Sequence, residues 1–137
     1  MLDIFRHFHD KNRMEPLSPR PIHVEILAVT GSTMMTLASV TDPLRAANRL
    51  SGTNLFEWSL TSFDGNPVRM SGGLTLPVTS PFRSSDHGDY LIVVASFDHE
   101  QHAGKELVAA LRIAARNFAT VCGVVKRYQV QQHVERG

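Results

Sequence analysis

Long apolar runs, disulfide partners and a strong net charge are all missing from this sequence. The longest apolar run, Tyr90–Ala95, is far too short to span a membrane, and no apolar N-terminal stretch predicts a secretory signal. The single cysteine, Cys122, excludes an internal disulfide framework and is typical of a reducing cytoplasm. The sequence therefore predicts a cytoplasmic protein that does not enter the membrane.

The formal net charge of +1 is distributed unevenly along the chain. Residues 23–124 hold seven Lys and Arg against nine Asp and Glu, which gives −2 for this part, whereas both ends are positive. Proteins that bind DNA or RNA need a basic stripe to contact the phosphates. We therefore expect no direct nucleic-acid binding by this chain.

The length of 137 residues and the 42% apolar content suit one domain with a hydrophobic core. Residues 1–21 carry three prolines and no sustained period, which predicts a flexible leader. The domain is expected over residues 22–125. Residues 126–137 lose the apolar period where a parallel sheet normally continues with a covering helix, so we expect a tail on a C-terminally incomplete domain.

Hydrophobic periodicity predicts an α/β order of strands and helices. Strands are expected over residues 23–29, 55–63, 89–95 and 119–125, with a short hairpin within residues 68–78. One helix is expected from about Thr36 to residue 50, and a second within residues 96–118, with a buried stripe of Leu107, Leu111, Ala114 and Phe118. This order predicts a mostly parallel sheet with the first strand at its centre. Ligands of such sheets bind at the carboxyl ends of the strands, here at Thr30–Thr33, Ala95–Phe97 and Val124–Lys126.

Asp42 precedes Pro43, and this pair allows two interpretations. Asp at the N-cap followed by Pro at the first helical position is a common helix start. Alternatively, Leu37 and Val40 already fit the helical stripe, so Pro43 lies inside the helix and removes the bond to the Ser39 carbonyl, at a cost of about 3 kcal/mol. In the second case Asp42 is a candidate pocket acid.

A cysteine and a pair of histidines are further candidates for a catalytic or metal-binding role. Cys122 lies among valines with no visible histidine partner, so we expect a buried structural thiol rather than an activated nucleophile. His99 and His102 in the segment DHEQH lack further ligands at metal spacing, which favours a polar first helical turn. We therefore expect neither a metal nor a cofactor.

The segment TLASVTDPLRAANRLSG resembles the first-helix signature of the DJ-1/PfpI-like N-terminal domain of GlxA-type, AraC-family transcriptional regulators. The segments FEWSLTSFDGNPVRMSGGLTLPV, DYLIVVASFD and LVAALRIAARNFATVCGV follow in the family's order. The match covers about residues 22–124, and DPLRAANRL is its specific part. The resemblance implies a three-layer αβα sandwich with a mostly parallel sheet, which is flavodoxin-like and class I glutamine amidotransferase-like.

The resemblance also assigns positions to candidate ligand-binding residues. Asp42 stands at the family's acid position, normally Glu, and this favours the pocket interpretation. Ser32 lies in the turn after the first strand, and Ala95 and Ser96 stand where catalytic relatives place glycines that supply an oxyanion N–H. In the wider superfamily the catalytic Cys lies at a turn called the nucleophile elbow. Cys122 is a candidate because one of two possible alignments places it at this elbow. The elbow motif is broken in both alignments. Asp42 would therefore hold a ligand's cationic or amide group and would not catalyse.

The resemblance implies a domain that senses a small molecule, of the amino acid or quaternary amine class, and that forms a homodimer. The DNA-binding module of such regulators is not in this chain. A hydrolase or amidase of the DJ-1/PfpI type is the first alternative, and it requires an activated nucleophile. A dimerisation module without ligand or catalysis is the second. A premature stop or shifted reading frame after about residue 124 would explain the tail.

Overall fold

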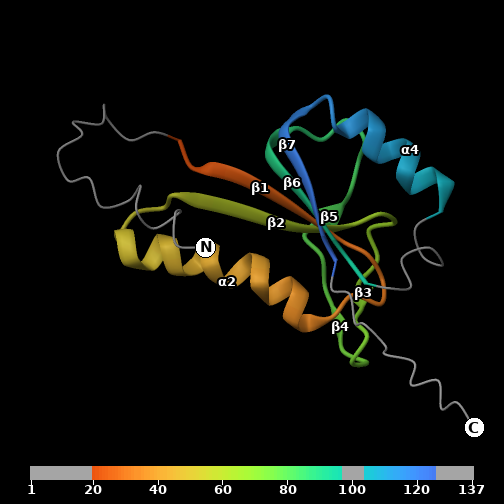
Figure 1. The fold of residues 1–137 in the computed structure, drawn as a ribbon, viewed down its shortest axis with the longest axis horizontal. Helices are drawn as coiled ribbons and strands as arrows, with labels where there is room; N and C mark the ends of the chain where they lie inside the picture. The colour runs from red at the N-terminus through yellow and green to blue at the C-terminus, as the bar shows by residue number, and fades with distance from the viewer. Residues whose placement is uncertain (1–19, 97–103, 126–137) are drawn as a thin grey trace, which may run out of the picture.

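The computed structural model of the protein describes residues 20–96 and 104–125, and they form a parallel sheet with a helix on each face (Figure 1). The strands of this sheet are β1 (Ile22–Ala28), β2 (Phe56–Ser62), β5 (Ser80–Pro81), β6 (Gly88–Ala95) and β7 (Phe118–Val125). Their order is β5-β2-β1-β6-β7, and every neighbouring pair is parallel. The predictions of a parallel α/β sheet and of a central first strand are confirmed.

Helix α2 (Met34–Ser51) follows β1 and begins well before Asp42. Its N-cap is Thr33, whose hydroxyl accepts the Thr36 N–H at 3.1 Å, and its C-cap is Gly52 in the left-handed conformation (φ 67°). Pro43 therefore lies inside the helix. The interpretation of Asp42 as an N-cap is wrong, because a better cap stands upstream at the end of the preceding turn.

The apolar core divides into two clusters, one on each face of the sheet. On one face, α2 and the hairpin of β3 (Val68–Arg69) and β4 (Thr75–Leu76) cover alternate residues of β1, among them Val24 and Ile26. On the other face, α4 (Lys105–Ala114) packs its Leu107 against Leu27 and Leu91. Each fully buried aliphatic side chain of this kind stabilises the fold by about 1.5–3 kcal/mol, so the two helices fix the sheet from both sides.

Two expectations about the second half of the fold need correction. Phe118 is buried as predicted but belongs to β7, because the chain turns after Ala114, where the Asn117 N–H donates to the Ala114 carbonyl at 2.8 Å. The edge strand β5 was not predicted, since Ser80–Pro81 is too short to show any period. A proline fits there because an edge strand has one unpaired side. None of the described helices is long and apolar enough to cross a membrane.

Candidate functional site

The turn between β1 and α2 is joined to β6 by one buried hydroxyl. Ser32 is fully buried, and its Oγ lies 2.6 Å from the Val29 carbonyl oxygen and 3.0 Å from that of Val94. A single hydroxyl donates one proton, so it is shared between these two acceptors. Ser32 thereby holds the carboxyl ends of the two central strands together, directly beside Ala95 and Ser96.

The hairpin β3–β4 is attached to the same edge by backbone hydrogen bonds. The Gly31 N–H donates to the Arg69 carbonyl at 2.9 Å, and the Ser71 N–H donates to the Ser32 carbonyl at 2.9 Å. Gly31 has φ 87°, a conformation that glycine adopts without strain. Three segments distant in sequence therefore meet at the carboxyl edge, which we define as residues 30–33, 69–71 and 94–96. The structure brings the predicted site residues Ser32, Ala95 and Ser96 together there.

The first turn of α2 adds an apolar surface beside this carboxyl edge. Met34 and Met35 are both exposed, with 39% and 66% of their surface accessible. Methionine side chains are flexible and polarisable, and they adapt to ligands of different shape. Their exposure places both methionines outside the core.

Asp42 does not reach the carboxyl edge. It lies roughly 13 Å along α2 from Thr33, at a rise of about 1.5 Å per residue. Its side chain is 66% exposed, and its Oδ1 lies 3.6 Å from Nε of Arg45, one turn further on. The expectation that this carboxylate faces the carboxyl ends of the strands is corrected, since the helix directs it to solvent.

Cys122 is exposed in the structure, which corrects the expectation of a buried thiol. It lies opposite Ile92 on β7, the edge strand of the sheet, where no described strand covers its outer side. Strand geometry places it roughly 10 Å before the carboxyl end of β7. It is therefore separated from Ser32, Ala95 and Ser96. His99 and His102 lie outside the described residues.

A second polar cluster, missed from the sequence, lines a cavity of about 300 Å³ on the face of the sheet that α4 also covers. Its walls carry two acids, Glu25 and Asp86, two histidines, His23 and His87, and four Ser and Thr residues. Glu25 is only 4% exposed, and its Oε1 accepts the Thr61 hydroxyl at 3.2 Å. Burial, followed by the hydrogen bond and charge of Asp86, raises the pKa of Glu25 to about 7.

One feature of the sequence could have predicted this cluster. Glu25 is the only charged residue in the strand sequence IHVEILA, between apolar neighbours. Glutamate is rarely fully buried unless it is paired, so an acid in the middle of a central strand is unusual. Among the described residues, no group of three or more His, Cys, Asp or Glu could hold a metal ion.

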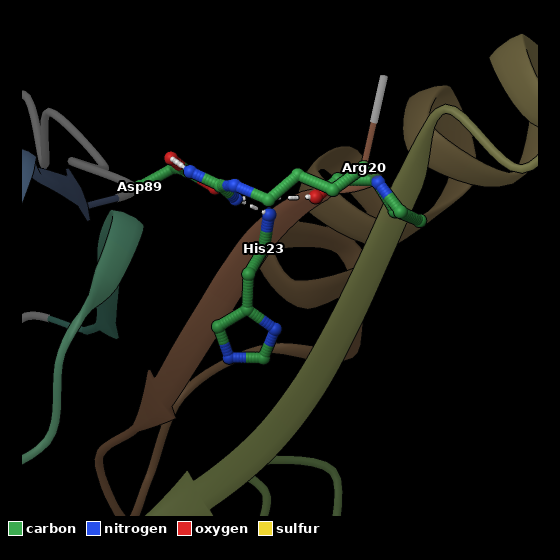
Figure 2. A network of polar contacts seen from close by, with 4 residues as sticks. Arg20, His23 and Asp89 are labelled. Atoms are coloured by element: carbon green, nitrogen blue, oxygen red, sulfur yellow. Dashed lines mark hydrogen bonds and ion pairs between the residues drawn. The ribbon is translucent and has the colours of Figure 1, made fainter. Parts of the chain in front are cut away.

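Arg20 and Asp89 fix the entry of β1 beside this cavity (Figure 2). Two guanidinium nitrogens of Arg20 donate to the two carboxylate oxygens of Asp89 at 2.8 and 2.9 Å, and the His23 backbone N–H donates to Asp89 Oδ2 at 2.8 Å. These contacts, with the Arg20 hydrogen bond the largest, lower the pKa of Asp89 to about 2. Figure 2 shows the His23 imidazole pointing away from this ion pair.

Comparison with known proteins finds transcriptional regulators among the relatives of this chain. It is 35% identical over 98 residues to the HTH-type transcriptional regulator CdhR of Pseudomonas aeruginosa, and 32% identical over 101 residues to the HTH-type transcriptional regulator GbdR of the same species. These matches cover 72% and 74% of this chain. The chain is a homologue of AraC-family transcriptional regulators. It spans less than a third of the length of these curated relatives, and no family model matches it.

Solved structures agree with the fold of this AraC-type homologue. An AraC family transcriptional regulator from Pseudomonas putida superposes with a TM-score of 0.64 at 24% identity, over 75% of this chain and 64% of that one. A THiJ/PfpI family protein from Pseudomonas syringae gives a TM-score of 0.59 at 14% identity, over 83% and 49%. At these identities the likeness shows the fold alone. The predicted DJ-1/PfpI-type αβα architecture is confirmed.

Proposed function

We propose that this chain is the part of an AraC-family regulator that senses a small molecule, and that the ligand binds at the carboxyl edge. The observation that carries the proposal is the convergence around Ser32, where the ends of β1 and β6 and the hairpin are joined by hydrogen bonds. Ligands of open α/β sheets bind outside the carboxyl ends of the strands. The homology to HTH-type regulators supports a regulatory role for such a site.

The proposed ligand contacts are Ser96 and the backbone around Ser32 and Ala95, with Met34 and Met35 as an apolar wall. The backbone groups of this edge offer hydrogen bonds, and the methionines offer adaptable apolar contact. We propose an amino acid or a quaternary amine as the ligand class. We do not include Asp42, which is exposed beside Arg45 on α2, or Cys122, which lies opposite Ile92 within β7.

We further propose that the chain acts without catalysis. An enzyme of the DJ-1/PfpI type needs a nucleophile at the carboxyl edge together with an acid or base within reach. Cys122 lies in the middle of β7, and the curated relatives are regulators. In the proposed regulator the protein works in the cytoplasm as a homodimer, and a separate module contacts DNA, because residues 23–124 have a net charge of −2.

Calorimetry of the full chain against a panel of amino acids and quaternary amines tests this proposal. We expect one class to bind and to raise the melting temperature, since a ligand stabilises the state that binds it. Ser96→Leu places a bulky side chain at the edge and should abolish binding. Ser39→Leu, an exposed position on α2, is the matched control and should leave binding unchanged. Equal binding by wild type and Ser96→Leu would place the ligand elsewhere.

A further inference from the structure

The cavity around Glu25 is separate from the carboxyl edge. Glu25 precedes the end of β1 by three residues, roughly 10 Å along the strand. Its register partner on β2 is Ser59, and Thr61 lies two residues further on the same side of β2. The side chains of Val24 and Ile26 point to the opposite face, into the core under α2. Alternate residues of one strand therefore serve the core and the cavity.

Among the described residues, the basic side chains that line the cavity of Glu25 are the histidines His23 and His87. None of the described residues that line the cavity is Lys or Arg. Arg20, just before β1, uses two of its guanidinium nitrogens on Asp89. The polar neighbours of Glu25 are a hydroxyl, from Thr61, and a second acid, Asp86. Buried acids are normally paired with a cation, and the described lining of this cavity supplies no permanently charged one.

We propose that this cavity binds a small compound with a primary ammonium group, held between the carboxylates of Glu25 and Asp86. A primary ammonium has three N–H donors, which the carboxylate oxygens and the hydroxyls of Ser59, Ser80 and Ser85 can accept. A quaternary ammonium has no N–H donor and cannot make these hydrogen bonds. A volume of about 300 Å³ lies at the lower end of small-molecule pockets, so the compound is small.

A proton competes with this cation. Burial and Asp86 keep Glu25 protonated up to near neutral pH. Binding of the ammonium then requires the ionised pair, so the shared proton leaves to the buffer as the cation enters. The other titratable groups that face Glu25 are His23 on β1, and Asp86 and His87 on the loop before β6. Binding should therefore strengthen from pH 5 to pH 8, and the number of protons released should fall over the same range.

Titration calorimetry with ethanolamine and choline tests the proposal, because the two share a hydroxyethyl group and differ in the ammonium. We expect ethanolamine to bind the full chain and choline to bind at least about tenfold more weakly. In two buffers of different ionisation enthalpy, ethanolamine should release protons near pH 6. The variant His23→Gln,His87→Gln should still release them, which assigns the proton to the acids.

Variants of the acids complete the test. Glu25→Gln should reduce ethanolamine affinity by about tenfold or more, and Asp86→Asn should do so independently if the first variant folds poorly. Asp42→Asn, an exposed acid on α2, is the matched control and should bind like wild type. No ethanolamine binding by folded wild type, equal binding of choline, or an equal loss in Asp42→Asn would overturn the proposal. Ser96→Leu should leave ethanolamine binding intact, so the proposal for this cavity and the proposal for the carboxyl edge are tested independently.

Discussion

Glu25 makes the stability of this fold depend on pH in a direction that can be worked out. Its pKa rises from an ordinary 4.5 to about 7 on folding, so the native state binds more protons than the unfolded chain between these values. The native state gains most below pH 4.5, and this gain is lost as the pH rises through about 7. Since a pKa difference of one corresponds to about 1.4 kcal/mol, Glu25 lowers the free energy of unfolding by about 3 kcal/mol between pH 4 and pH 8.

Glu25→Gln should remove this dependence. The Gln side-chain oxygen can still accept the Thr61 hydroxyl, but it carries no charge at any pH. Urea unfolding at pH 5, 6, 7 and 8 measures the free energy of unfolding of both proteins. The difference between variant and wild type should grow by about 2.5 kcal/mol from pH 5 to pH 8 in favour of the variant. For Asp42→Asn, at an exposed position, the free energy of unfolding should change with pH as it does in wild type. If the free energy of unfolding of Glu25→Gln also changes with pH as in wild type, the reasoning is refuted.

Three further predictions concern other parts of the chain. Arg20→Gln should raise the pKa of Asp89 from about 2 toward its ordinary 3.8, which NMR titration of the Asp89 carboxyl carbon measures. The stability that Arg20 adds above pH 4 should be lost as the pH drops toward 2. Gly88→Ala should destabilise by about 1–3 kcal/mol in urea, because a Cβ there would lie 3.0 Å from the nearest side chain, whereas Gly72→Ala, in open space, should stay within about 0.5 kcal/mol. The Cys122 thiol should react completely with Ellman's reagent in native buffer, and reaction only in denaturant would contradict its exposure.

The long strands and helices were predictable because the spacing of their apolar side chains follows which residues are buried. The apolar alternation of β1 and the helical stripe of α2 predict the central strand and the helix that covers it, and both are confirmed. Strand β5 was missed because a strand of two residues has no period, and its place is set by the β2 edge with which it pairs.

The carboxyl edge was partly predictable, whereas the cavity was not. Ser32, Ala95 and Ser96 follow from the rule that parallel strands present their carboxyl ends at one edge. The orientation of Asp42 did not follow, because half a turn of helix separates a buried face from an exposed one, and Asp42 shares the exposed side with Arg45. The cavity depends on β2, β5 and the loop before β6 meeting beside Glu25, and sequence spacing does not encode that meeting.

The stability that the protein loses through Glu25 at neutral pH helps to decide whether this acid is structural or functional. A small domain is stable by about 5–15 kcal/mol, so a loss of about 3 kcal/mol at neutral pH is a large fraction for one side chain. A glutamine would fill nearly the same volume and keep the Thr61 hydrogen bond without that loss. If Glu25→Gln is the more stable protein at pH 8 yet no longer binds ethanolamine, packing does not explain the acid, and the binding of a cation does. If the variant is more stable and binding is unaltered, the acid has no role in the cavity. The stability curve and the binding curve of this one substitution therefore decide together between a structural and a functional acid.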